Sequence, residues 1–176
     1  PRPYTSYRDQ GTKLLVHTPY TPRPFDHAMA NAAGHSVMVT NRGLHTSSNG
    51  NSQQNRLTPD WPDTVTKEVP SEAFYLYDLD KRTWHSPTYH PMNDPTASHE
   101  AEFGLDGTAV FRMTQGTLST ELTVFVPPED PLGVYLLTIR NTADQPKRLR
   151  VAPYFQMVLG FQPEQTGDLH ARYDRT

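Results

Sequence analysis

Residues 109–126 read AVFRMTQGTLSTELTVFV, two runs of strand-favouring residues on either side of the turn pair Gln115-Gly116. The second run ends against Pro127-Pro128, and proline lacks the N–H that would continue a strand ladder. Runs of this kind separated by a short glycine-containing turn are typical of β-hairpins. The stretch therefore predicts a hairpin with strands at Ala109–Gln115 and Leu118–Val126.

The neighbouring sequence repeats this arrangement. Asp106-Gly107 is a strong hairpin signal, because glycine accepts a positive φ, and it precedes the strand at Ala109–Gln115. By contrast, residues 1–35 are loop-like apart from one short strand, and the polar stretch Thr46–Asn55 has no apolar periodicity, which predicts a long loop. The other expected strands are Lys13–His17, Ser36–Asn41, Ala73–Asp78, Thr83–Ser86, His99–Phe103, Val134–Arg140 and Arg148–Phe161.

The last expected strand, Arg148–Phe161, carries its apolar side chains at odd positions. Because side chains alternate across a strand, they predict a single apolar face. Pro153 interrupts the ladder and indicates a bulge or a sheet edge. The side chains of this face are Leu149, Val151, Phe155, Met157, Leu159 and Phe161.

Roughly nine or ten strands and no convincing helical stripe predict an all-β fold, an antiparallel sandwich. The 176 residues suit one domain, and 17 prolines favour turns over long helices. We expect an N-terminal extension with a short strand at 1–19, the β-sandwich at 20–161, and the start of a linker at 162–176. The first residue is Pro1 and not Met, so we read the chain as a piece of a longer protein.

Composition excludes several classes of partner. The net charge of −3 arises from 16 basic and 19 acidic residues mixed along the chain, without the basic stripe that nucleic acids or anionic membranes require. No apolar run approaches the roughly 18–20 residues of a membrane span, so we expect no direct membrane contact in this segment. The absence of cysteine excludes disulfides and thiolate metal sites.

The titratable residues form no self-contained catalytic motif, neither a G-x-S-x-G elbow nor a P-loop, G-x-G-x-x-G or H-E-x-x-H. His85 and His90 lie five apart in a proline-rich loop, where a metal pair is one reading and exposed loop histidines the other. Asp60 and Asp63 flank Trp61, which suits either a sugar subsite or a small core anchor. We expect no bound metal and no cofactor.

Two groups of residues are candidates for binding sugar. Asn49–Thr58 combines neutral amide donors and acceptors with one guanidinium, which suits sugar hydroxyls, a contact with another domain, or capping of its own loop. Tyr75, Tyr77 and Trp84 lie on adjacent hairpin strands and would stack against a sugar ring unless that face is core. The candidate contacts in the first group and beside it are Asn51, Gln53, Gln54, Asn55, Arg56 and Trp61.

A series of motifs in this order resembles the N-terminal β domain of glycoside hydrolase family 94, formerly glycosyltransferase family 36. The two sharpest pieces are N-R-L-T-P at 55–59 and E-L-x-x-F-V-P at 121–127. The family includes cellobiose-type phosphorylases and the C-terminal part of cyclic β-1,2-glucan synthases, and the wording of residues 53–56 looks most like the synthase branch. The remaining pieces are TPRPF at 21–25, NSQQ at 51–54, EAFYLYD at 72–78, W-x-S-P at 84–87, DP at 130–131 and RN at 140–141.

The resemblance implies a galactose-mutarotase-like β supersandwich followed by a helical linker and an (α/α)6 barrel. It places the acid of an inverting phosphorolysis in that barrel, so no catalytic residue is expected here. Asn51, Asn55 and Arg56 match the family's box and would face the barrel or the substrate entrance. Relatives often carry Arg where Gln53 stands, which puts any phosphate or sugar contact at this position in doubt.

These observations support three hypotheses. The first is a β-sandwich domain of a carbohydrate-active phosphorylase or glucan synthase, inactive alone, with docking, sugar-binding and dimerisation roles. Its partners would be a β-linked glucan, its own barrel and a second copy, in the cytoplasm as part of an inner-membrane-associated enzyme. The second is a stand-alone carbohydrate-binding module. The third is a mutarotase-like enzyme that would use His85 or His99 with Glu100 or Glu102.

Overall fold

The computed structural model describes residues 3–51, 55–59, 68–160, 167, 169–170 and 172. Over these residues the chain is built from strands and one short 3-10 helix, η1 (Asp9–Gly11). The strands are β1 (Thr5–Arg8), β2 (Lys13–Val16), β3 (Asp26–Ala30), β4 (His35–Thr40), β5 (Gly43–Asn49), β6 (Glu72–Asp78), β7 (Thr83–His85), β8 (Ser98–Gly104), β9 (Thr108–Gln115), β10 (Leu118–Phe125), β11 (Val134–Asn141) and β12 (Leu149–Phe155).

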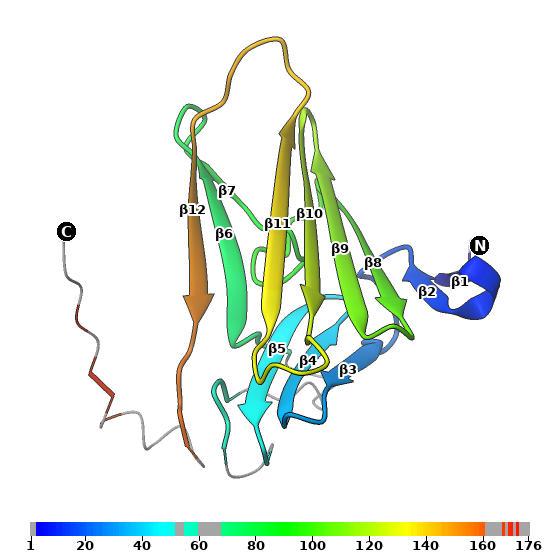
Figure 1. Cartoon of the computed structure of the whole chain (residues 1–176). Coiled ribbons are helices and arrows are strands. Elements are labelled where there is room, and N and C mark those ends of the chain that lie inside the picture. Colours follow the sequence, from blue (N-terminus) through cyan, green and yellow to red (C-terminus); the bar gives the residue numbers. More distant parts are fainter. Residues whose placement is uncertain are drawn as a thin grey trace.

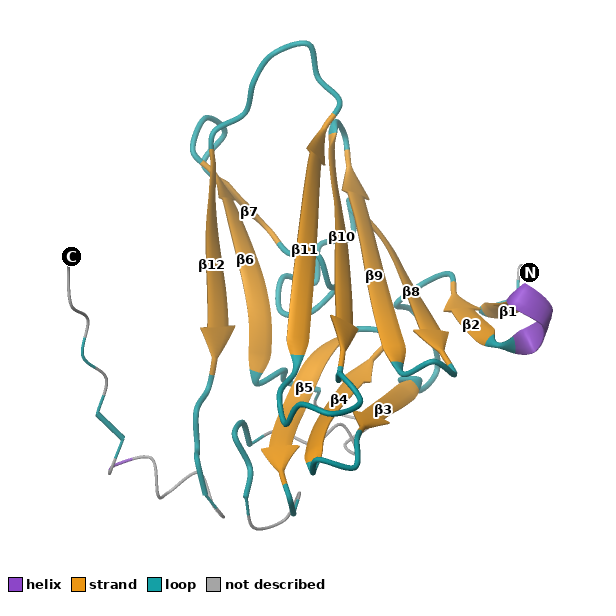
Figure 2. Ribbon diagram, in the orientation of Figure 1, coloured by secondary structure: helices purple, strands orange, loops and turns teal. Residues whose placement is uncertain are grey.

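The strands form two antiparallel sheets (Figure 1). Sheet A has the order β1-β2-β8-β9-β10-β11, and sheet B has the order β12-β6-β5-β4-β3, with β7 paired to β6. Figure 2 shows how little helix interrupts this arrangement. Both hairpins expected around residues 106–107 and 115–116 are present, as β8-β9 and β9-β10. The prediction of an all-β antiparallel sandwich is therefore confirmed.

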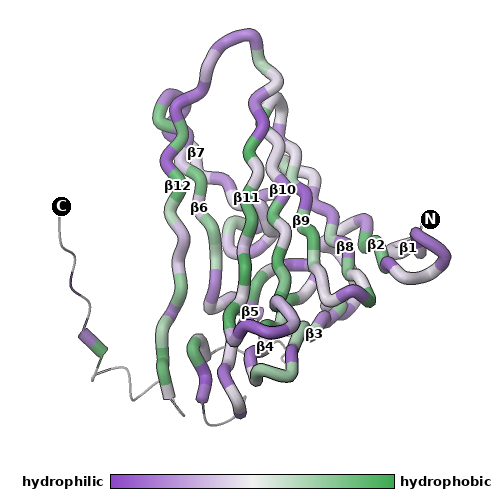
Figure 3. The backbone as a smooth tube through the Cα atoms, viewed as in Figure 1, coloured by the Kyte–Doolittle hydropathy of each residue, from purple (hydrophilic) through white to green (hydrophobic). Residues whose placement is uncertain are grey.

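The hydrophobic core lies between the inner faces of the two sheets. Apolar residues colour the facing strands in Figure 3. Alternation along each strand sends one set of side chains inward and the other outward. Burying this set supplies the main driving force for bringing the sheets together. The core cluster comprises Val16, Met29, Val37, Val39, Leu44, Phe74, Ala101, Phe103, Ala109, Phe111, Leu122 and Val124.

The prediction of a long loop over Thr46–Asn55 is wrong in its first half, because β5 extends to Asn49. The polar side chains of β5 are buried and hydrogen-bonded: Thr46 Oγ1 donates to the Thr58 carbonyl at 2.6 Å, and the Ser36 and Ser48 hydroxyls lie 2.6 Å apart. A buried strand can consist of polar residues when their side chains are hydrogen-bonded. Such a strand has no alternating apolar pattern, so apolar periodicity does not predict it.

Residues 1–35 contain more strand than the single one expected at Lys13–His17, since β1 and β3 flank β2. Each of these extra strands lies at the end of its sheet, and β3 buries only Met29. An edge strand with one buried side chain carries little pattern. The domain boundaries expected at 19/20 and 161/162 stay predictions.

The strand expected over Arg148–Phe161 ends at Phe155, and only its odd positions within β12 share the inward face. Met157 and Leu159 lie beyond the strand and are exposed, and Phe161 lies outside the described residues. Val151 lies opposite the buried Leu76, and Phe155 packs against the core cluster. Val151 is nevertheless exposed, because β12 is the end strand of sheet B. Pro153 thus sits on a sheet edge, as predicted. Across the part of the chain that is described, no helix has the length and apolar character of a membrane span.

Candidate functional site

Residues 55–59 (NRLTP) form a strand-like segment inside sheet B, which we call the box segment. Arg56 pairs with Ser48 of β5 on one side and with Gly160 on the other. The backbone N–H groups of Arg56 and Gly160 each donate to the other residue's carbonyl at 3.0 Å. The box segment therefore lies between β5 and the residues that follow β12. In the rest of sheet B, this position between β5 and β12 is occupied by β6.

Three of the predicted contact residues, Asn51, Asn55 and Arg56, lie in or next to the box segment. The backbone N–H of Asn55 donates to the Asn51 carbonyl at 2.8 Å, and both amide side chains are exposed. Arg56 is half-buried, and its Nη1 donates to the Pro59 carbonyl at 3.4 Å. The other predicted contacts, Gln53, Gln54 and Trp61, lie outside the described residues, as do Asp60 and Asp63.

A cavity of about 440 Å³ opens beside the box segment. Its wall is mostly apolar, with Leu57 and Met157 on the side of sheet B and Leu132 on the loop before β11. A few polar groups are placed among these side chains, an arrangement common in small-molecule sites. Burial lowers the pKa of His35, one of these groups, so its ring is held neutral. The other lining residues are Ser47, Thr58, Pro131, Gly133, Tyr135 and Phe155.

Glu72 lies fully buried next to this cavity and joins three elements. It accepts a hydrogen bond from Thr58 Oγ1 at 2.8 Å and another from the Tyr135 hydroxyl at 2.5 Å. Burial, reinforced by the charge of Glu72, raises the pKa of Tyr135 well above its usual value, so the phenol stays a donor. The carboxylate ties the box segment to β6 and β11, and it has no exposed surface for reaching a substrate.

The aromatic candidates converge on the outer face of sheet B. Phe74 and Leu76 of β6 point into the core, and the alternate residues Tyr75 and Tyr77 therefore point outward. The ring centroids of Tyr77 and Trp84 are 4.6 Å apart, and those of Tyr75 and Trp84 are 6.1 Å apart. The structure thus places all three predicted aromatic residues in one group.

Sequence reasoning missed the other members of this group. Tyr154 of β12 lies 6.4 Å from Tyr75 between ring centroids, and a notch of about 370 Å³ is lined by Tyr75, Trp84, Met92 and Ala152. The sequence did contain a signal for Tyr154. The odd positions of its strand carry the apolar pattern, so Tyr154, at an even position, is expected to point outward. We call Tyr75, Tyr77, Trp84 and Tyr154 the aromatic surface.

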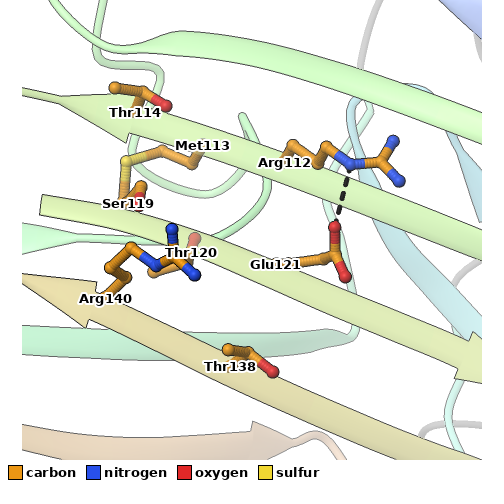
Figure 4. Close-up of a pocket in the computed structure, with 8 residues that line it drawn as sticks. All are labelled: Arg112, Met113, Thr114, Ser119, Thr120, Glu121, Thr138 and Arg140. Carbon is orange, nitrogen blue, oxygen red and sulfur yellow. Dashed lines mark hydrogen bonds and ion pairs between the residues drawn. The ribbon is translucent and has the colours of Figure 1, made fainter.

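A second hollow, of about 330 Å³, lies on sheet A over β9, β10 and β11. Figure 4 shows Arg112 and Glu121 reaching toward each other across neighbouring strands, with Arg140 coming from β11. Arg112 Nε lies 2.9 Å from Glu121 Oε2, and Arg112 Nη1 lies 3.5 Å from Glu102 Oε2. Arg8 and Lys13 also lie within 3.7 Å of Glu102. Each carboxylate of this network therefore contacts at least one cation, whereas among the described residues no ion pair holds Arg140.

A buried cluster around Glu68 was not anticipated from the sequence. Glu68 Oε1 lies 2.8 Å from His45 Nε2, Glu68 Oε2 lies 3.2 Å from Arg42 Nη1, and Thr40 Oγ1 donates to the same carboxylate. Burial tends to raise the pKa of Glu68, but the hydrogen bonds from His45 and Thr40, with His90 nearby, outweigh it and hold the pKa far below its usual range. Thr40, Arg42 and His45 lie 23–28 positions before Glu68 in the chain, so no local sequence motif predicts the cluster.

The histidines singled out from the sequence contact separate partners in the structure. His85 Nε2 contacts Thr83 Oγ1 at 3.1 Å, and His90 Nε2 faces Glu68 Oε2 at 3.8 Å. His99 lies on the inner face of β8, with burial lowering its pKa to about 4, while Glu100 and Glu102 occupy alternate positions of the same strand. Among the described residues, no three His, Asp or Glu side chains gather as a metal site.

Comparison with known proteins identifies the sequence family. Residues 12–173 match the family described as "Glycosyl hydrolase 94, supersandwich domain". Among curated proteins, the chain is 27% identical over 158 residues to the 3-O-beta-D-glucopyranosyl-beta-D-glucuronide phosphorylase of Paenibacillus borealis. The aligned region covers 89% of the chain and 19% of the phosphorylase.

Two further relatives are similar over most of the chain. The cyclic beta-(1,2)-glucan synthase NdvB of Rhizobium meliloti (strain 1021) is 30% identical over 140 residues, 80% of the chain and 5% of the synthase. The N,N'-diacetylchitobiose phosphorylase of Vibrio furnissii is 24% identical over 155 residues, 87% of the chain and 19% of that enzyme. The chain therefore spans at most a fifth of the length of these curated relatives.

Proposed function

The chain belongs to glycosyl hydrolase family 94 as a supersandwich domain, and from this premise we propose that it is the non-catalytic β part of a carbohydrate-active phosphorylase or β-glucan synthase. In this proposal it docks against a catalytic (α/α)6 barrel and borders the sugar entrance. The observation that carries the proposal is the box segment, which pairs with sheet B, leaves Asn51 and Asn55 exposed, and lines an apolar cavity with Leu57 and Thr58.

The environments of three carboxylates, Glu68, Glu72 and Glu102, support a non-catalytic role for this domain. Hydrolysis or phosphorolysis of a glycosidic bond needs an acid that can reach the bridging oxygen. Glu68 and Glu72 are buried among hydrogen-bond partners, and Glu102 is held by three cations. A carboxylate held in this way stabilises the sandwich and is not poised above a substrate.

The docking role follows from the cavity beside the box segment. Leu57, Met157 and Leu132 give it an apolar wall, and Met157 and Leu132 are exposed. Apolar side chains gathered at a surface are typical of a protein contact. We propose that the barrel covers this cavity and that copies of the assembly associate through the same side of the domain. If the parent enzyme is of the synthase type, we propose a cytoplasmic, inner-membrane-associated location for it.

Two measurements test this function. The purified chain, incubated with phosphate and with cellobiose, laminaribiose or sophorose, is expected to release no sugar 1-phosphate. Phosphate-dependent release that a point substitution in this chain abolishes would overturn the proposal. The reading frame is expected to continue past the codon of Thr176 into several hundred residues of helical pattern. A stop codon at that point would instead support the stand-alone binding module.

A further inference from the structure

We infer that the aromatic surface of sheet B is a binding site for a β-linked gluco-oligosaccharide, separate from the box segment. This inference rests on the proposed carbohydrate role and assigns it to specific residues. The rings of Tyr154, Tyr75 and Trp84 follow one another across β12, β6 and β7, with centroid steps of 6.4 and 6.1 Å. These three strands lie side by side in Figure 1.

Two of the rings are exposed on the outer face of sheet B. Trp84 is 48% exposed and Tyr154 is 45% exposed, although each belongs to a strand of the sheet. Exposed apolar groups that cluster in this way mark binding surfaces more often than isolated ones do. Trp84 is also braced against Tyr77 at 4.6 Å, so its ring is held in place before any ligand arrives.

The floor of the surface has the shape to receive a ring. Ala152 lies opposite Tyr75 in the register of β12 and β6, and its small side chain leaves the notch of about 370 Å³ between Tyr75, Trp84 and Met92. This volume is at the low end of small-molecule sites, about 300–1,000 Å³. The rings of Tyr75 and Trp84 meet at 85°, so they form two walls of a corner.

The notch itself is lined by apolar side chains, and polar groups elsewhere on the same face suit a hydroxyl-rich ligand. Within the described part of the chain, no hydrogen bond or ion pair occupies the Arg150 guanidinium or the hydroxyls of Tyr75 and Tyr154. Arg150 lies opposite Tyr77 on the same face. A guanidinium presents five donors in a fixed fork, and each phenol adds a donor and an acceptor. A pyranose ring offers C–H groups for the negative faces of the rings and hydroxyls for these polar groups.

A β-linked chain of glucose units fits this row better than a compact sugar does. Its rings succeed one another in an extended line, and the three aromatic rings also form a line across neighbouring strands. Sheet A offers no equivalent, because its hollow is bordered by the paired side chains of Arg112 and Glu121. The site is therefore specific to one face of the domain.

The test is calorimetric titration of the purified chain with cellopentaose, laminaripentaose and a β-1,2-linked glucopentaose, with maltopentaose as the α-linked comparison. We expect saturable binding of at least one β-linked sugar, with Kd on the order of 1 mM or tighter. Trp84→Ala, and Ala152→Leu, which fills the notch from its floor, are each expected to weaken binding about tenfold or more. Trp84→Phe is expected to recover part of the affinity.

The matched control is Tyr7→Ala, which removes an aromatic side chain that is 72% exposed on β1, in the other sheet, and should leave Kd unchanged. Thermal unfolding of every variant confirms that each is folded. Equal affinity of the native chain and Trp84→Ala would overturn the assignment to this surface while leaving the docking role intact. No binding by the native chain, or equal binding of maltopentaose, would also overturn it. Phosphorolysis by the chain would count against the proposed function and leave this site standing.

Discussion

On the outer face of sheet A charged side chains contact one another, whereas on the outer face of sheet B aromatic side chains do. Glu102 lies within 3.7 Å of Arg8, Lys13 and Arg112, so its charge is compensated by its own sheet. On sheet B, Trp84 and Tyr154 contact other rings but keep about half of their surface exposed. Charged groups that are already paired with each other gain little from binding a ligand. Exposed rings and hydrogen-bond donors without partners can gain contacts from one.

Among the charged groups, the largest effect on stability is expected at Glu68, because its ion pair is buried and those on the outer face of sheet A are more exposed. Its side chain is 3% exposed and it faces Arg42 and His45. Glu68→Gln leaves the Arg42 guanidinium without its buried counter-charge and weakens the hydrogen bond with His45, so the free energy of unfolding at pH 7 should fall by about 3 kcal/mol. Urea denaturation measures this directly. A loss no larger than that of the exposed control Glu121→Gln would show that the cluster contributes little.

The same carboxylate predicts how acid unfolds the domain. Because hydrogen bonds depress the pKa of Glu68 in the folded state, its contribution is fully present above its ordinary value of 4.5 and is lost as the pH falls below that value. The unfolded chain binds the proton first, so stability declines with falling pH. Glu68→Gln should flatten the acid limb of a stability–pH curve. An unchanged slope below pH 4.5 would contradict this account.

A smaller effect is expected on the outer face of sheet A itself. Glu102→Gln removes the anion shared by three cations and leaves them to repel one another, which should cost about 1–2 kcal/mol. Glu121→Gln breaks only the contact with Arg112 at a carboxylate that is 48% exposed, and should cost less than about 0.5 kcal/mol. Thermal unfolding at low and high salt separates the two, since salt screens the more exposed pair more strongly.

How far the sequence predicts this molecule depends on what kind of signal each element carries. The hairpins around Gly107 and Gly116 follow from turn chemistry, and the inward face of β6 follows from alternation at Phe74 and Leu76. The buried polar strand β5 is different, because Thr46 and Ser48 find partners on other segments. Those partners are visible only once the chain is folded.

The residues of the candidate sites show the same difference between local signals and tertiary contacts. Tyr75, Tyr77 and Trp84 were predicted as a group because they lie on two strands of one hairpin, which local pairing brings together. Tyr154 joins them from β12, about 70 positions along the chain, through a pairing of β12 with β6 that no local pattern specifies. The Glu68 cluster likewise depends on tertiary contacts between residues of different segments. Local pattern therefore predicts hairpins and the residues on them, and misses pairings made across the fold.

A small effect on stability is also expected from the aromatic surface, and this sharpens the contrast between the faces. Trp84→Ala removes a ring that is already half exposed and whose closest ring contact is Tyr77, so the free energy of unfolding should fall by no more than about 1 kcal/mol. Phe111→Ala, at a fully enclosed core ring, should cost about 3–5 kcal/mol. Urea denaturation of both variants measures the difference. A loss at Trp84 as large as that at Phe111 would mean that the ring holds the sandwich together, and its exposure would no longer argue for a ligand. A small loss, together with weakened sugar binding, would mean that this face keeps its aromatic side chains for recognition and not for stability.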